Sequence, residues 1–300
     1  MKPAALEQVA QFRQYLAKER RLSVHTDSNY ARDLGALIRF CTQQGIADWA
    51  ALEHPQVRLF AARAHASGLA PRSIQRRLSA VRSFLKFLIR EGILTHNCAI
   101  EVRAPKGQRR LPVTLDADSM ARLLEIPGTD LLAVRDRAIM ELLYSSGLRL
   151  AELVGLNLQD LNAADRTVRV LGKGDKTRVL PVGRKALTAL SAWLDQRVTL
   201  VPEDANAVFV GGTGRRLGAR AIQKRVAYWA VRQGLPMHVH PHLFRHSFAS
   251  HLLESSGELR AVQELLGHAN IATTQLYTHL DFQHLARTYD ATHPRARRKA

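Results

Sequence analysis

One stretch near the carboxyl end of the sequence is rich in side chains that can do chemistry: VHPHLFRHSFASHLLESSGELRAVQELLGHANIATTQLYTH. His242 and Arg245 are three residues apart, so at the start of a helix both side chains should project from one face. The N-terminus of a helix presents backbone N–H groups and a positive dipole end, which favour a bound anion. The pair therefore predicts a phosphate site, although His242 taken alone could equally be bonded to the local backbone.

Tyr277 lies at the end of this stretch and could serve as a nucleophile. Ile271 and Leu276 could hold its short helical segment against a core, and His268 precedes it after a Leu-Gly helix end. Tyrosine is a weak nucleophile because its free pKa is about 10. Clustered arginines and a base could lower that pKa or remove the proton in the transition state, which would allow attack on a phosphodiester.

Two further cations stand earlier in the chain. In SGLRLAEL, Arg149 follows Gly147 at the start of a predicted helix, where a cation is favoured only beside an anion. In LGKGDKT, Lys173 is expected at the tip of a hairpin. Taken alone, each of these cations has a simpler interpretation. Arg149 could pair with Glu152 at the surface, and Lys173 could serve only solubility, as lysines in turns often do.

A zinc site is an alternative use of the same region, because five histidines crowd it: His238, His240, His242, His246 and His251. His242 and His246 have the i, i+4 spacing of zinc ligands on a helix. However, the sequence offers no H-E-x-x-H motif, no cysteine pair and no obvious carboxylate to complete the coordination. We therefore expect no bound metal.

The composition points to a polyanionic partner. The 300 residues contain 44 Lys and Arg against 26 Asp and Glu, a net charge of +18, whereas soluble surfaces usually lie nearer neutrality. No stretch approaches the roughly 18 apolar residues of a membrane span, and the first residues lack the apolar region of a signal peptide. Cys41 and Cys98 have neither metal-site nor disulfide-framework spacing. We expect a cytoplasmic protein that binds nucleic acid, not a membrane-spanning or disulfide-rich one.

The first hundred residues should form helices. Residues 71–92, PRSIQRRLSAVRSFLKFLIREG, combine an apolar stripe with a basic face that almost lacks acidic partners. We interpret this helix as both core and DNA contact; a core helix with a merely soluble outer face is the alternative. Residues 103–113, RAPKGQRRLPV, have the composition of a basic interdomain linker. The DNA-binding candidates are Arg72, Arg76, Arg77, Arg82, Lys86, Arg109 and Arg110.

The rest of the chain should be mainly helical with one small antiparallel sheet. Strand patterns flank the glycine-rich turn at 167–171 and 177–182, and Gly147 has the position of a helix C-cap. Helical patterns cover 116–125, 130–146, 185–200, 219–233, 242–254 and 259–266. The predicted fold class is therefore mainly α with a small sheet, in a helical domain over 1–102, the linker over 103–113 and a second domain over 114–300.

Taken in order, SGLRLAEL, LGKGDKTR, HLFRHSFA and LLGHANIATTQLYTH resemble the active-site pattern of the tyrosine recombinase (phage integrase) family. The resemblance covers nearly the whole chain. It implies a two-domain, C-shaped clamp on DNA and a tyrosine nucleophile that forms a 3′-phosphotyrosyl intermediate without a cofactor or metal. The catalytic residues that it implies are Arg149, Lys173, His242, Arg245, His268 and Tyr277.

Within that family, the ending DFQHLARTYDATHPRARRKA resembles the recombinases that resolve chromosome dimers in bacteria. That resemblance implies a double-stranded recombination site, a heterotetramer with a second recombinase, and activation by a septal DNA translocase. The segment after Tyr277, with Phe282, Leu285 and Tyr289, would dock on a neighbouring protomer. A type IB topoisomerase shares the chemistry. A non-catalytic DNA-binding regulator would account for the charge but would give Tyr277 no role.

Overall fold

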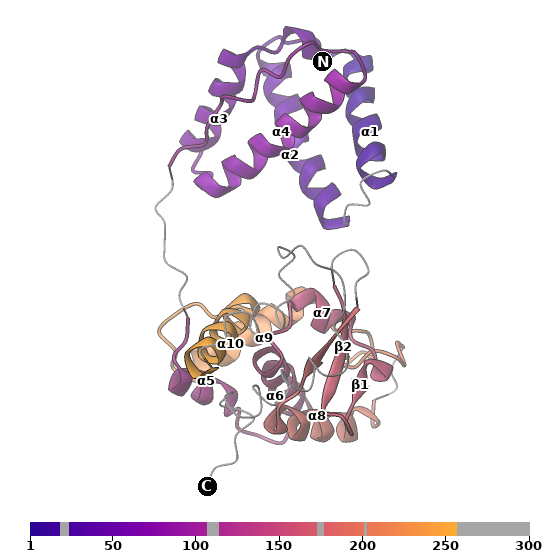
Figure 1. Cartoon of the computed structure of the whole chain (residues 1–300), viewed down its shortest axis with the longest axis vertical. Coiled ribbons are helices and arrows are strands. Elements are labelled where there is room, and N and C mark those ends of the chain that lie inside the picture. Colours follow the sequence, from indigo (N-terminus) through magenta and orange to yellow (C-terminus); the bar gives the residue numbers. More distant parts are fainter. Residues whose placement is uncertain (19–23, 107–113, 173–176, 201–202, 257–300) are drawn as a thin grey trace. The chain divides into compact units, whose positions relative to one another are not determined.

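The computed structural model describes residues 1–18, 24–106, 114–172, 177–200 and 203–256 (Figure 1). The chain divides into two compact units, Met1–Arg110 and Leu111–Ala300. Within the described ranges, no helix is long and apolar enough to cross a membrane. The helix predicted at 259–266 lies outside these ranges.

In its described part, the first unit consists of helices packed around an apolar core. The α-helices are α1 (Pro3–Lys18), α2 (Val24–Gln43), α3 (His54–Ala66) and α4 (Pro71–Arg90). The short 3-10 helix η1 (Trp49–Ala51) lies between α2 and α3. The helix pattern at 71–92 is confirmed by α4, whose apolar stripe of Ile74, Leu78, Val81, Leu85 and Leu88 is buried. We named no separate helix for α3 from the sequence.

The second unit combines helices with a small sheet, which confirms the predicted fold class. Its described helices are α5 (Ala117–Leu124), α6 (Leu131–Ser145), α7 (Leu150–Gly155), α8 (Arg184–Arg197), α9 (Ala219–Arg232) and α10 (Pro241–Ser256), with the 3-10 helix η2 (Leu158–Asp160). Its strands are β1 (Leu161–Asn162), β2 (Thr167–Leu171) and β3 (Thr177–Pro181), antiparallel in that order. The two-residue strand β1 was not predicted from the sequence.

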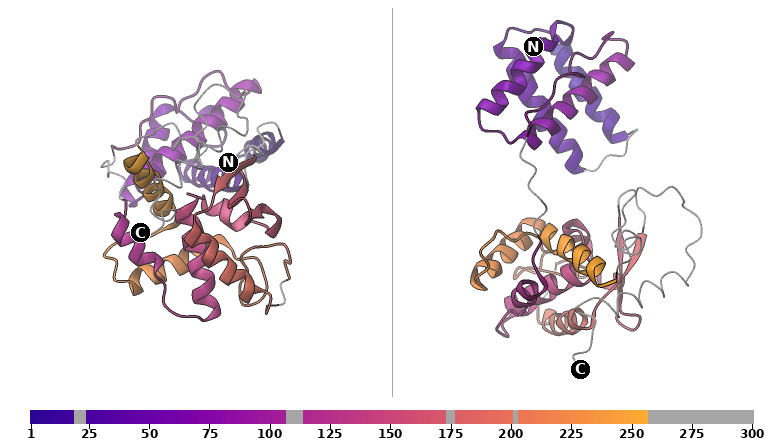
Figure 2. Two further views of the ribbon diagram at one scale, coloured as in Figure 1. Left: turned by 60° about the horizontal axis from the view of Figure 1, so that its bottom comes forward. Right: turned by 60° about the vertical axis from the view of Figure 1, so that its left-hand side comes forward.

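Helix α6 is the central element of this unit, because nearly all of it is buried and α8, α9 and α10 all pack against it (Figures 1 and 2). Asp130 begins the helix, since its carboxylate accepts hydrogen bonds from the backbone N–H groups of Leu132 and Ala133 at 3.1 Å. Gly147 follows its last turn with φ of +58°, a left-handed conformation that glycine adopts without strain. The prediction that the helix ends at Gly147 is thus confirmed, with Ser146 as the C-cap residue and Gly147 directly after it, and the chain then turns into α7.

Candidate active site

Arg149 stands at the entrance of α7, immediately after the Gly147 turn. Its backbone N–H donates to Oε2 of Glu152 at 2.8 Å, and its Nη1 donates to Oε1 of the same carboxylate at 2.8 Å. Glu152 therefore satisfies the N-terminus of α7 and also fixes the direction of the arginine side chain. The Arg149 side chain remains 39% exposed, so it can still meet a ligand from solvent.

Arg245 reaches the same place from the first half of α10. It is buried, and its Nη1 donates to the carbonyl oxygen of Gly147 at 2.6 Å. Burial, and then the neighbouring charges of Arg149 and Arg178, lower the pKa of Arg245 to about 10, while Glu152 acts in the opposite direction. Arg245 is still protonated at neutral pH. Its lowered pKa means that burial and the neighbouring cations destabilise its positive charge.

Arg178 brings a third guanidinium group, from strand β3. Its Nη2 donates to both carboxylate oxygens of Glu152, at 3.0 and 2.9 Å. The Arg178 side chain is 17% exposed and that of Glu152 only 5%. Burial lowers the pKa of Arg178, Glu152 raises it, and Arg149 lowers it again. Arg178 on β3 and Arg149 at the start of α7 thus bind the same buried carboxylate.

These four groups form an arginine cluster: Arg149, Arg178 and Arg245 around Glu152. Three cations and one carboxylate leave a net charge of +2. Excess positive charge in a partly buried place is destabilising unless an anion joins it. Guanidinium forks bind phosphate oxygens through paired, charge-assisted hydrogen bonds. The cluster is therefore suited to hold the non-bridging oxygens of a phosphodiester.

His242 and Arg245 share α10 but differ in environment, because His242 is exposed and Arg245 is buried. The centroid of the His240 ring lies 6.3 Å from that of the His242 ring and 6.0 Å from that of the His238 ring. Burial, followed by the charges of His242, His238 and His246, lowers the pKa of His240. His242 itself is accessible from solvent, about one helical turn before Arg245 on α10.

The histidine-rich region forms no metal centre in the described ranges, where no group of three or more His, Cys, Asp or Glu residues could hold a metal ion. One of the five crowded histidines has a different partner: His251 is buried, and its Nδ1 lies 2.8 Å from the hydroxyl of Tyr144. That contact joins α10 to α6 and has no part in a metal site.

Three of the predicted catalytic residues, Lys173, His268 and Tyr277, lie outside the described residues, as do the linker arginines Arg109 and Arg110. The structure therefore brings together Arg149 and Arg245 from the predicted set, with His242 on the same helix as Arg245. The roles of all six residues stay predictions.

The basic face of α4 contains side chains of two kinds. Arg72 and Lys86 are exposed. Arg82 instead donates to the carbonyl oxygens of Ala99 and Val102, and so fixes the chain that follows α4. Both neighbours Arg76 and Arg77 pair with Asp33 of α2, which the sequence did not indicate.

Asp33 itself is buried, with 1% of its side chain exposed. Burial raises the pKa of Asp33, although Arg76, Arg77 and Arg32 act to lower it. The basic face of α4 therefore has an acidic partner on the neighbouring helix, which corrects the expectation that its cations almost lack acidic partners.

Sequence reasoning passed over Glu152 and Arg178 as parts of the site. Glu152 had a signal, because an acidic residue three positions after a helix start is typical of a capping box. Arg178 had none, because only the approach of β3 to α7 brings it to the carboxylate.

Two family models match the chain. The model of the phage integrase family covers residues 113–284, and that of the phage integrase N-terminal SAM-like domain covers residues 9–92. The chain belongs to the phage integrase family. Among curated proteins, it is 52% identical over 296 residues to the tyrosine recombinase XerC of Serratia marcescens, with 99% of this chain and 97% of that protein covered. It is 57% identical over 286 residues to the tyrosine recombinase XerC of Pseudomonas fluorescens, with 95% of each covered.

Solved structures agree on the fold. A crystal structure of the XerH site-specific recombinase bound to a palindromic difH substrate, in a post-cleavage complex, has a TM-score of 0.71 and 22% identity, with 95% of this chain and 85% of that chain covered. The Tn1549 transposon integrase in complex with transposon right end DNA has a TM-score of 0.70 and 19% identity, with coverage of 92% and 97%. At these identities the likeness shows a shared fold, that of the family.

Proposed function

We propose that this chain is a site-specific tyrosine recombinase, which cleaves and rejoins DNA through a 3′-phosphotyrosyl intermediate on Tyr277. Relatives named tyrosine recombinase, at 52% and 57% identity over nearly the whole chain, support this function. The observation that carries it is the arginine cluster, in which Arg149 and Arg178 bind the carboxylate of Glu152 and Arg245 lies close enough for the charges of all three groups to act on its pKa. A cluster with net charge +2 suits a negatively charged phosphodiester. An ion pair that only stabilises the fold would have no need of this excess positive charge.

The proposed chemistry divides among six residues. The Tyr277 oxygen attacks phosphorus and loses its proton with the help of His242, while the bond from phosphorus to the 5′-oxygen breaks. Arg149 and Arg245 stabilise the charge that grows on the non-bridging oxygens, and His268 donates a hydrogen bond to the phosphate. Lys173 gives a proton to the departing 5′-oxygen, which is a poor leaving group without it. Because the phosphotyrosyl bond conserves the energy of the broken link, a free 5′-hydroxyl can reverse the step.

The two units have different parts in this proposal. Residues 1–102 form a helical domain that binds core DNA, residues 103–113 a basic linker, and residues 114–300 the catalytic domain with a partner-docking segment. The N-terminal SAM-like match over 9–92 supports the first assignment. Phosphate contacts come from the exposed cations of α4 and from the linker, so that the two domains close on DNA as a C-shaped clamp.

The biological reaction in this proposal is the resolution of chromosome dimers at cell division, in the cytoplasm. The relatives named XerC support it. The chain would act in a heterotetramer with a second recombinase, XerD, on paired DNA sites, and the FtsK translocase would activate the complex. The segment after Tyr277 would dock on the neighbouring protomer.

Covalent trapping tests the chemistry directly. The full chain, alone and with the second recombinase, is incubated with nicked duplexes whose short downstream fragment diffuses away after cleavage. We expect a protein–DNA adduct that resists denaturant from the wild type, with a free 5′-hydroxyl on the departing strand, and none from Tyr277→Phe, which should still bind DNA. Tight binding without any adduct from the wild type would favour a non-catalytic regulator.

A further inference from the structure

The carboxylate of Glu152 is the shared acceptor of the arginine cluster. Its side chain is only 5% exposed. Oε2 accepts the backbone N–H of Arg149 and Oε1 accepts Nη1 of the same arginine, both at 2.8 Å. A buried carboxylate destabilises the fold unless a cation and hydrogen-bond donors offset its charge. Glu152 therefore needs a counter-ion, and the two arginines that bind it, Arg149 and Arg178, are the candidates.

Arg178 is the more buried of these two arginines. Its Nη2 donates to both oxygens of Glu152, at 3.0 and 2.9 Å. Its side chain is 17% exposed, against 39% for Arg149. An ion pair is stronger where less water screens it. Arg178 is therefore the stronger counter-ion of the carboxylate, and Arg149 is the cation that a ligand can reach more easily from solvent.

Strand β3, which carries Arg178, is fixed by bonds that do not involve α7. The strand is paired with β2 along its length. At its end the hydroxyl of Ser146 donates to the carbonyl oxygen of Pro181 at 2.8 Å. The backbone N–H of Gly183 then donates to the hydroxyl of Ser145 at 2.7 Å. Because the strand is held in this way, the guanidinium of Arg178 can set the position of the carboxylate on α7.

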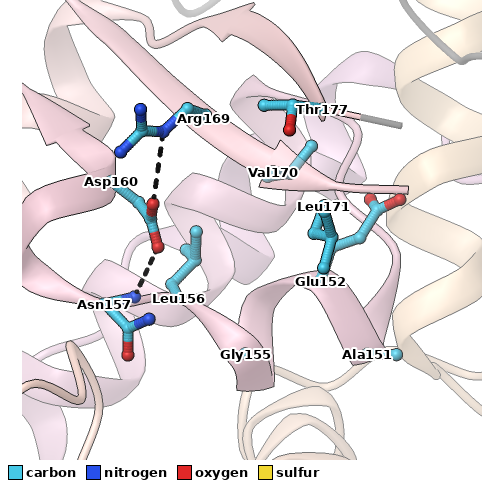
Figure 3. A pocket seen from close by; sticks show the side chains of 10 residues that line it. All are labelled: Ala151, Glu152, Gly155, Leu156, Asn157, Asp160, Arg169, Val170, Leu171 and Thr177. Carbon is cyan, nitrogen blue, oxygen red and sulfur yellow. Dashed lines mark hydrogen bonds and ion pairs between the residues drawn. The ribbon is translucent and has the colours of Figure 1, made fainter. Parts of the chain in front are cut away.

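Close packing does not replace this contact. An open pocket of about 430 Å³ lies between α7, η2 and the hairpin of β2 and β3, and Glu152, Gly155, Val170 and Leu171 are among its lining residues (Figure 3). Figure 3 shows Glu152 extending from α7 toward the strands. The direction of its carboxylate is thus set by the hydrogen bonds that it accepts, and the bonds from Arg178 come from the side of the strands.

We infer that Arg178 is a positioning residue: as the counter-ion of Glu152, it leaves the charge of Arg149 to a phosphodiester and fixes the direction of that guanidinium. This inference rests on the proposed function. Three arginines and one carboxylate give the cluster a net charge of +2, which falls to +1 without Arg178. Arg149 and Glu152 would then pair mainly with each other, and their charges would cancel.

Direct phosphate binding and plain stabilisation of the fold are the competing roles of Arg178. All three roles predict slower cleavage when Arg178 is replaced, so one variant does not separate them. A second change, Glu152→Gln, removes the negative charge but keeps an oxygen that can accept the N–H of Arg149. It returns the net charge of the Arg178→Met cluster from +1 to +2. The counter-ion role predicts that this second change restores Arg149, whereas a neutral amide cannot replace a lost phosphate ligand or a lost structural ion pair.

Single-turnover cleavage of nicked duplexes at saturating DNA tests the inference. We expect Arg178→Met to cleave about 100-fold more slowly than the wild type, because misplacement of a catalytic group by about 1 Å can have that effect. Arg178→Met/Glu152→Gln should cleave about tenfold faster than Arg178→Met, since removal of both members of a buried ion pair is less disruptive than removal of one. Arg169→Met is the matched control: it removes the exposed ion pair with Asp160 and should cleave at the wild-type rate.

The gain from the second change must depend on Arg149. In chains that also carry Arg149→Ala, Arg178→Met and Glu152→Gln should alter the rate only a few-fold, because the residue through which they act is absent. A gain that persists without Arg149 would be a general effect of charge on the phosphate and would overturn the inference. Additive losses from Arg178→Met and Arg149→Ala, with no gain from Glu152→Gln, would assign Arg178 to direct phosphate binding.

Circular dichroism and urea unfolding of each variant come first, because Arg178→Met could fail to fold. If it does, Arg178→Gln, which can still donate a hydrogen bond to the carboxylate, replaces it in every comparison. Failure of the proposed function is distinct, since the wild type would then cleave no duplex. The same variants are in that case compared by the rise of their melting temperature in sodium sulfate, which should be smaller in Arg178→Met than in the wild type and should return in Arg178→Met/Glu152→Gln. A rise that stays small in the double variant would overturn the inference.

Discussion

The guanidinium Nη1 of Arg245 lies 2.6 Å from the carbonyl oxygen of Gly147. This bond joins the end of α6, where the chain turns toward Arg149, to the helix that also bears His242. The turn is further restricted by packing, because a Cβ added to Gly147 would lie 2.6 Å from Cδ1 of Phe248. Two arginines from distant parts of the chain are thus held together by the backbone of one glycine.

Gly147→Ala should therefore damage both stability and activity. Its φ of +58° is strained for alanine, and the added methyl group would displace Phe248 of α10. We expect a loss of about 2 kcal/mol or more in the free energy of unfolding, measured with urea, together with a large loss of DNA cleavage. Gly155→Ala is the control, because a Cβ there meets nothing within 4 Å, and it should change stability little. Equal stability of the two variants would contradict this account of the turn.

Arg245→Lys should separate binding from catalysis. Lysine keeps the positive charge but cannot donate to the Gly147 carbonyl and to phosphate through one planar fork. By analogy with other preorganised donors, the cleavage rate should fall by about 100- to 1000-fold, while the DNA affinity changes only a few-fold. Single-turnover rates at saturating DNA, together with binding at the same salt concentration, measure the two effects. A fall in affinity as large as the fall in rate would assign Arg245 to binding alone.

The cations of α4 should differ in what they do. Arg82 binds the carbonyl oxygens of Ala99 and Val102, so Arg82→Ala should lower the thermal stability of the chain. Lys86→Ala should leave stability unchanged and reduce the salt dependence of DNA binding by about 0.9 in the slope of log affinity against log salt, which corresponds to one phosphate contact. An unchanged slope for Lys86→Ala would remove this residue from the DNA interface.

The thiols of the two cysteines should not react with thiol reagents in the folded protein. Both are buried, and burial raises the pKa of Cys41 to about 11 and that of Cys98 in the same direction. Because the folded-state pKa of Cys41 is above its ordinary value of 9.0, the neutral thiol contributes stability below that pH, and this contribution is lost as the pH rises toward about 11. At mildly alkaline pH a thiol reagent should label neither residue until denaturant is added. Rapid labelling of the native chain would contradict the buried positions.

The sequence predicted most of the local structure but only part of the site. Local signals were enough where neighbours in sequence decide the conformation, as at the Gly147 turn and the apolar stripe of α4. They failed where distant segments meet. Arg178 and Glu152 are 26 residues apart and Arg76 and Asp33 are 43 apart, so no spacing rule connects them. Charge alone could not distinguish the arginines that stabilise the fold from those that contact DNA.

The net charge of the arginine cluster gives the last prediction: an oxyanion should stabilise the free protein. Sulfate resembles a phosphate group in charge and shape, so its binding among Arg149, Arg178 and Arg245 should relieve the repulsion that helps to lower the pKa of Arg245. The melting temperature should rise more in sodium sulfate than in sodium chloride of equal ionic strength, because a ligand that binds the folded state stabilises it by mass action.

Sulfate also stabilises proteins without binding, by exclusion from their surface, and a variant separates the two effects. Arg149→Ala removes the most exposed cation of the cluster, at 39% exposure, and should lose the sulfate-specific part of the gain. Arg169→Ala lies on the neighbouring strand, with its side chain 53% exposed, and should keep it. If both variants gain as much from sulfate as the wild type, the cluster does not bind oxyanions in the absence of DNA, and the positive charge is offset within the protein itself.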